Sequence, residues 1–452
     1  MAGGKFNPLT ETERPGTYIN LESTRRDIVG IATRGIALVP LIEHSYGPAK
    51  QFITLNNDSP DAARSLLGFS IFDDDPNMLL IREAFKNART VIVYIPSQGA
   101  KATMISGALS ATARYGGSRG NAIKCSVTAN PIADFDVTIF LDTVIVSEYR
   151  GLATIEELIE RNDPWIEFSG TGALTDVAGV ALTGGMDGTL VVSDITEFLD
   201  ASESLRWNTL AFPIEATGQS GDPAPALYAA VLSKIKYLRE DVGKYRKAVV
   251  PNFKANYEGI INVTNSVMLG DLALTTAQVT AWVAGADAGA SNVKSNTLEL
   301  YVGATGIVGQ KNNIAATEAI RNGEFFFSFS EEGTVVVDYD INSLTTFNFP
   351  KDKTYRKNRV IRVFDTFAEA LMANFPPNKF NNSPTDWEIM EGIGRSILRQ
   401  FGPDGVGALK NIDFESDFFV DRTISEDDKT YFIVGLEAVD SSEKLFFTIK
   451  TR

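Results

Sequence analysis

The chain has 452 residues, of which 44% are hydrophobic and 22% charged, and its formal net charge is −15. At about 100–200 residues per domain, this length predicts three or four domains, and the apolar content excludes a globally disordered chain. The acidic balance argues against nucleic acid as a partner, because an acidic surface repels phosphates. No apolar run approaches about 20 residues, so we expect no insertion into a membrane.

Single cysteine and histidine residues restrict the possible chemistry. Cys125 has no partner for an intramolecular disulfide, and no CxxC motif is possible. A Ser-His-Asp triad or a histidine-based metal site would have to use His44, which follows a strand-like run; we interpret it as a surface or strand-end residue. The first residues lack the apolar core of a signal peptide, so we expect folding in the cytoplasm. We predict no catalytic residue, metal or cofactor.

Residues 1–24 are predicted to form an N-terminal arm. A polar, turn-like stretch precedes a short strand-like segment. A lone strand at a chain end must pair with its own sheet or with that of a neighbour. The strand-like residues are Thr17, Tyr18, Ile19, Asn20 and Leu21.

Residues 25–97 alternate between apolar strands and helices, a pattern typical of a sheet covered on both faces. The predicted strands are Ile36–Ile42 and Thr90–Pro96, and the predicted helices are Asp61–Gly68 and Asn77–Ala88. The residue pattern changes at residue 98. Short alternating strands with frequent turns predict an antiparallel β-sandwich over 98–186. Its clearest strands are Ile123–Ala129 and Asp136–Asp142, with one helix near Thr154–Arg161.

Residues 187–345 return to the helix–strand rhythm. Together with 25–97 they are predicted to form one α/β unit into which the sandwich is inserted. The predicted helices are Ile195–Ser202, Pro225–Glu240 and Thr275–Ala290, and the predicted strands are Thr209–Pro213, Lys247–Pro251 and Ile260–Val263.

Residues 346–452 are predicted to form a small α+β domain. We expect a strand at Arg359–Phe364, then helices at Phe367–Ala373 and Trp387–Phe401. Three further strands are predicted at Phe414–Val420, Thr430–Glu437 and Lys444–Ile449.

Three charged or glycine-rich segments are candidate sites. Gly184–Gly188 lacks the lysine of a phosphate-binding loop, so we interpret it as a hinge between domains. The basic run Lys351–Arg359 is either a solvated face or a patch that meets an acidic surface on a neighbouring subunit. Asp421–Asp428 is a candidate for that acidic surface, or only a charged turn.

Several blocks, in order along nearly the whole chain, resemble contractile phage tail sheath proteins of the type common in phages and prophages of Gram-positive bacteria. One departure lies in the last block, where the family usually has proline before Val439 and Ala-Met in place of Ser441 and Ser442; here Ala438 precedes the valine. The blocks are Arg14–Ile19, Gly184–Thr189, Trp207–Pro213, Asn256–Val263, Thr280–Ala286 and Val439–Phe446.

The resemblance implies a subtilisin-like α/β core that is not a protease, and hexameric rings stacked helically around an inner tail tube. It also implies contraction that drives the tube through a cell envelope, with the protein in the virion tail after assembly in the host cytoplasm. The implied partners are the chain itself, the inner tail tube protein, and baseplate and tail terminator proteins.

In this family, N- and C-terminal arms join a sheet in adjacent subunits. The matching segments are Thr17–Leu21 and the six residues Lys444, Leu445, Phe446, Phe447, Thr448 and Ile449. Alternation along the second segment predicts an apolar face of Leu445, Phe447 and Ile449. We further expect the tube contact on the helix Trp387–Phe401, through Arg395 and Arg399.

Two other functions remain open from the residues alone. A self-assembling surface-layer or adhesin protein would also polymerise, although the missing signal peptide argues against it. A hydrolase on the α/β unit would need a carboxylate-only mechanism, because residues 190–345 contain no histidine.

Overall fold

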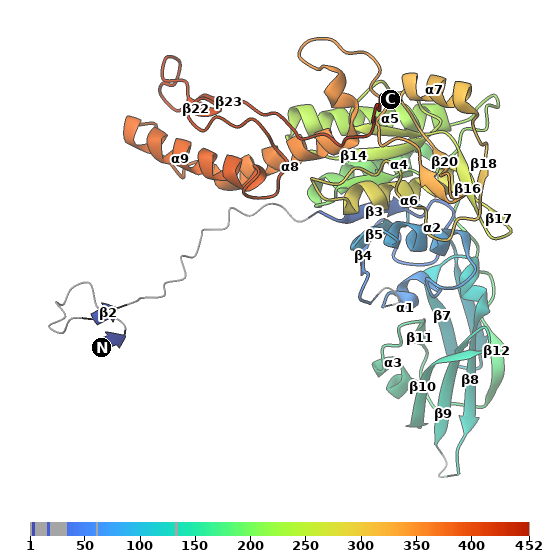
Figure 1. Ribbon diagram of the computed structural model, residues 1–452. Helices are drawn as coiled ribbons and strands as arrows, with labels where there is room; N and C mark the ends of the chain where they lie inside the picture. Colours follow the sequence, from blue (N-terminus) through green and yellow to red (C-terminus); the bar gives the residue numbers. More distant parts are fainter. Residues whose placement is uncertain (1, 5–15, 19–33, 60–61, 132–133, 452) are drawn as a thin grey trace.

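The computed structural model describes residues 2–4, 16–18, 34–59, 62–131 and 134–451. Figure 1 shows a central α/β region, a β-sandwich that projects from one end of it, and a helical C-terminal region that extends from the other end. Within the described residues, no helix is both long and apolar enough to cross a bilayer.

The central region is built on a seven-stranded sheet with the order β19-β15-β14-β13-β3-β5-β4. Strand pairing is parallel except between β4 and β5. Strands that precede the sandwich in the sequence (β3, β4 and β5) and strands that follow it (β13, β14, β15 and β19) therefore belong to one sheet. The bounds are β3 Ile36–Pro40, β4 Phe52–Asn56, β5 Thr90–Tyr94, β13 Thr209–Ala211, β14 Lys247–Pro251, β15 Ile260–Val263 and β19 Glu324–Phe325.

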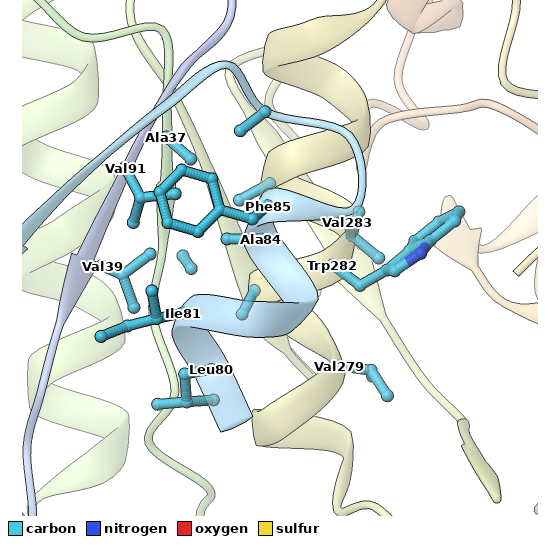
Figure 2. Packing of buried hydrophobic residues seen from close by; sticks show 14 of the residues in the cluster. Ala37, Val39, Leu80, Ile81, Ala84, Phe85, Val91, Val279, Trp282 and Val283 are labelled. Carbon is cyan, nitrogen blue, oxygen red and sulfur yellow. The ribbon is translucent and has the colours of Figure 1, made fainter. Parts of the chain in front are cut away.

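Helices cover both faces of this sheet, which explains why its strands are apolar without alternation. In β3, Ala37 and Val39 pack with α2 and α6, as Figure 2 shows, whereas Leu38 packs with α4 and α5 on the other face. The bounds are α1 Arg64–Leu67, α2 Pro76–Phe85, α4 Val192–Ala201, α5 Ala224–Lys236 and α6 Thr276–Gly289.

Two glycines allow α6 to lie unusually close to the end of α2. A Cβ atom added to Gly285 would lie 2.3 Å from the carbonyl oxygen of Ala84, and one added to Gly289 would lie 2.1 Å from that of Asn87. Any side chain at these positions would push the helix away, so the contact depends on glycine.

Two smaller sheets and helix α7 complete the central region. A three-stranded sheet has the order β17-β16-β18, and β20 pairs with β21. The bounds are β16 Ser266–Leu269, β17 Leu272–Ala273, β18 Gly306–Val308, α7 Asn313–Arg321, β20 Phe327–Phe329 and β21 Val335–Val337.

The sandwich consists of two antiparallel sheets with the orders β10-β9-β8-β12 and β11-β7-β6. Ile123, Cys125 and Val127 point inward from β8 and are buried, while the residues between them are half-buried, as period-two alternation requires. The bounds are β6 Lys101–Ser106, β7 Leu109–Gly116, β8 Ile123–Ala129, β9 Phe135–Leu141, β10 Val144–Leu152, α3 Ile155–Glu160, β11 Ile166–Ser169 and β12 Val177–Ala181.

The C-terminal region differs from the prediction at its start. The strand predicted at Arg359–Phe364 is wrong, because these residues belong to one helix, α8, which spans Asn358–Asn374. The buried residues Val360, Val363, Phe367 and Ala370 recur at intervals of three and four, the spacing of one helical face. The remaining elements are α9 Pro384–Phe401, β22 Phe418–Val420 and β23 Phe432–Val434.

Candidate functional site: the terminal arms and their surroundings

The C-terminal tail is anchored to the central region at Glu443. Its carboxylate accepts hydrogen bonds from the hydroxyls of Ser295, at 2.8 Å, and Thr297, at 2.7 Å, and it pairs with Lys357. Two residues earlier, the Ser441 hydroxyl accepts a hydrogen bond from Arg359. The chain is therefore held up to residue 443.

Beyond this anchor, four large apolar side chains are exposed. The exposed fractions are 66% for Leu445, 91% for Phe446, 83% for Phe447 and 87% for Ile449. The predicted strand at Lys444–Ile449 does not form within the single chain, where this segment has no regular secondary structure. Its pairing with a neighbouring subunit stays a prediction.

The N-terminal arm is described only in part. Thr17 and Tyr18 lie in β2, Gly16–Tyr18, which pairs in parallel with β1, Ala2–Gly4. Ile19, Asn20 and Leu21 lie outside the described residues. The predicted role of this arm in a neighbouring sheet stays a prediction.

The two-stranded sheet β22–β23 offers a strand edge on the surface. Each strand has the other as its only strand partner among the described residues. The outer edge of β22 is partly used, since the Val420 amide donates to Glu391 Oε1 at 3.0 Å. One face of the sheet packs on α9, where the Phe418 ring fits against Gly394. No strand among the described residues pairs with the outer edge of β23, so it is the freer of the two.

Helix α9 presents its two predicted tube-contact arginines differently. Arg399 is exposed, and its guanidinium lies 4.9 Å from the centre of the Phe414 ring. Arg395 is half-buried and lies 3.7 Å from Glu391 Oε2, one turn earlier. The inner face of the helix is apolar and joins the C-terminal core. Only Arg399 is fully available to a partner surface.

Most cations of the basic run Lys351–Arg359 are not solvated, although Lys353 is exposed. Lys351 donates to Glu258 at 2.6 Å, Lys357 pairs with Glu443, and Arg359 is buried against Ser441. Most of the run therefore holds parts of its own chain together. His44, expected at a surface or strand end, does follow β3, but it is buried, and burial lowers its pKa.

A fully buried charge network joins α8 to the central sheet, and it was not predicted from the sequence. Lys247 Nζ donates to Asp287 Oδ1 at 2.7 Å, and Arg362 Nη2 lies 3.2 Å from the same oxygen. Thr209 donates to the other oxygen of Asp287 at 2.7 Å. Burial favours the neutral acid, but the cations Lys247, Arg362 and Arg34 outweigh it and hold the pKa of Asp287 well below its usual range.

Solvent does not reach this network, so a substrate could not reach these charged groups if the α/β unit were a hydrolase. Lys247 and Asp287 are 1% exposed and Arg362 is 0% exposed. The charges satisfy one another at the boundary between three elements, β14, α6 and α8. Of these residues only Asp287 carried a signal in the sequence, because it is the one charge in the small apolar run Val283–Ala290.

Comparisons with known proteins agree with this architecture. Three family models match consecutive parts of the chain: the phage tail sheath protein beta-sandwich domain at 97–187, the phage tail sheath protein central domain at 188–343, and the phage tail sheath C-terminal domain at 350–452. The phage-like element PBSX protein XkdK of Bacillus subtilis is 33% identical, with 100% of both chains covered.

Solved structures extend the similarity to three dimensions. The crystal structure of the sheath tail protein from Desulfitobacterium hafniense has a TM-score of 0.78 and 32% identity, covering 94% of this chain and 100% of that one. The helical sheath of the anti-feeding prophage in its contracted state has a TM-score of 0.56 over 98% of this chain and 100% of that one; at 14% identity, this likeness concerns the fold alone.

Proposed function

Since the chain belongs to the phage tail sheath protein family, we propose that it polymerises as stacked hexameric rings around an inner tail tube and contracts to drive that tube through a cell envelope. Family membership covers nearly the whole chain, and the fold resembles that of a contracted sheath. On this proposal the role is structural and not enzymatic, and the protein is assembled in the host cytoplasm into a virion tail.

The observation that carries the proposal is the anchored tail with its exposed apolar side chains. Each apolar side chain of this size gains about 1.5–3 kcal/mol when it is fully buried. Each backbone hydrogen bond formed on strand pairing adds about 0.5–1.5 kcal/mol. A segment with four such side chains and an unpaired backbone is therefore suited to join a sheet in another subunit.

The acceptor on this proposal is the β22–β23 sheet of a neighbouring copy. Its outer β23 edge is free of other strands among the described residues, and an added strand would extend the sheet. The apolar face of Leu445, Phe447 and Ile449 would then be covered by the neighbour. The N-terminal arm, through Thr17–Leu21, would make a second link of the same kind.

The regions take different roles in this proposal. The segments 25–97 and 187–345 form a subtilisin-like core, 98–186 is a peripheral sandwich, and 346–452 provides the link between copies. Helix α9 contacts the inner tube through Arg399, with Arg395 beside it. Baseplate and tail terminator proteins bind the two ends of the sheath.

Truncation of the tail tests the mechanism. A chain ending at Glu443 keeps its anchor and loses only the exposed segment, so we expect a folded monomer that forms no tubes in electron microscopy. A chain ending at Ile449 is the matched control and should assemble normally. Normal tubes from the chain ending at Glu443 would refute strand exchange by this tail.

A further inference from the structure

A groove of about 800 Å³ lies at the root of the C-terminal tail. It is lined by α7, by the 3-10 turn Lys353–Arg356 and by the anchored residues before Leu445. Two acidic side chains, Asp440 and Glu443, line it. The cations that line it are Arg321, Lys353, Arg356, Lys357 and Lys444. This surplus of positive charge lies on a chain whose net charge is −15.

Arg356, one of these cations, has no counterion among the described residues. Arg356 is 8% exposed, and its Nε and Nη2 atoms are buried without a hydrogen-bond partner. Burial lowers the pKa of Arg356, and no carboxylate opposes that effect. An unpaired buried cation is costly, because it loses its water without gaining a partner. Lys357, the next residue, is by contrast satisfied by Glu443.

The exposed neighbours of Arg356 are also free. Within the described residues, Arg321 and Lys353 form no ion pair, and both are exposed. A groove with one buried and two exposed cations lacking anions matches a short run of carboxylates rather than a single one. One exposed segment that fits this description, in the loop of the sheet proposed to accept the tail, is on the same chain.

We propose that the groove of one subunit binds the acidic segment Asp421–Asp428 of a second copy of this chain. This segment connects β22 to β23 and is largely exposed. Glu426, Asp427 and Asp428 are consecutive exposed carboxylates, and none of them forms an ion pair within the described residues. The two surfaces thus have opposite charge, and each carries charged groups that lack an ion-pair partner within the described residues.

The placement of the two surfaces supports this pairing, which rests on the proposed function. The groove contains Lys444, the first residue of the tail, and the acidic segment closes the sheet that accepts the tail. A strand of six residues spans about 20 Å. The donor's groove and the acceptor's acidic segment are therefore held within about one strand length of each other.

A charge exchange tests the pairing. In the groove variant Arg321→Glu and Lys353→Glu, we expect the critical concentration for tube assembly to rise about tenfold, the effect of losing close charge pairs worth about 1.4 kcal/mol. The loop variant Glu426→Lys, Asp427→Lys and Asp428→Lys should have a similar effect. Combining both sets should restore assembly. Arg161→Glu, an exposed reversal on the sandwich, is the matched control.

Arg356→Met separates this role from a purely structural one. Because the Arg356 guanidinium has no counterion among the described residues, the monomer should unfold at the same or higher urea concentration, while assembly weakens. A destabilised monomer with normal assembly would overturn the proposal, and so would a groove variant that the loop variant fails to rescue. If the chain ending at Glu443 still forms tubes, the strand-exchange function fails instead.

Discussion

Replacing Asp287 with asparagine tests whether the buried network holds α8 to the central sheet. The substitution keeps the size of the side chain and removes its charge, which leaves Lys247 and Arg362 buried without their shared anion. Removing one partner from a buried ion pair costs about 3–5 kcal/mol. Because domains are commonly stable by only about 5–15 kcal/mol, Asp287→Asn should remove a large part of the total.

Urea denaturation, followed by circular dichroism, measures this loss as a change in the free energy of unfolding. The matched control is Glu437→Gln, which breaks an exposed pair with Lys410 at 2.9 Å. Since both partners are about half exposed, the control should cost less than about 1 kcal/mol. A cost for Asp287→Asn no larger than that of the control would refute the reasoning.

Acid provides an independent check on the same carboxylate. A pKa held below its usual range contributes stability that is present above about pH 4 and is lost as the pH falls through the lowered value. The wild-type chain should therefore keep the contribution of Asp287 at pH 5. The difference in stability between wild type and Asp287→Asn should shrink only in stronger acid.

Three further outcomes are expected. Gly285→Ala should destabilise the chain by about 1–3 kcal/mol, because the added Cβ crowds the Ala84 carbonyl. The control Gly392→Ala, whose Cβ meets nothing within 4 Å, should not destabilise it. Equal urea midpoints for the two variants would contradict this. Deleting the sandwich, 98–186, should leave residual assembly, because its two ends lie together, joined by the hydrogen bond of 2.8 Å from the Ala100 amide to the Met186 carbonyl. A sandwich found packed on the inner tube would contradict its peripheral placement. Charge reversal at Arg395 and Arg399 should reduce assembly on tubes without unfolding the monomer; unchanged assembly would exclude α9 as the contact.

Much of the fold could be predicted because its strongest signals are local. The continuous apolar runs at Ile36–Ile42 and Thr90–Pro96 correspond to β3 and β5, and the alternation at Ile123–Ala129 corresponds to β8. The start of α8 was mistaken for a strand because it is rich in β-branched residues, which favour strands in isolation. Its burial against the core over several turns outweighs that preference.

The candidate site was only partly predictable. The apolar tail can be identified from Leu445, Phe447 and Ile449, because their spacing by two residues is a local pattern. The ion pairs that join residues far apart, such as Lys247 with Asp287 or Lys357 with Glu443, depend on the tertiary fold. For the same reason, the sequence left the basic run at Lys351–Arg359 open between a solvated face and a patch for a neighbouring subunit, and did not predict that most of it binds its own chain.

A link made by giving one tail and receiving another has a consequence for how the polymer stops growing. In the proposed strand exchange, donor and acceptor are different surfaces, so the contact would be heterologous, and a stack of rings joined by it would have two unlike ends. One end would present empty β23 edges, and the other would present tails with Phe446 and Phe447 exposed to water, as they are in the single chain. On this proposal the length of the stack would be set by other proteins, which bring an apolar strand to one end and a receptive sheet edge to the other.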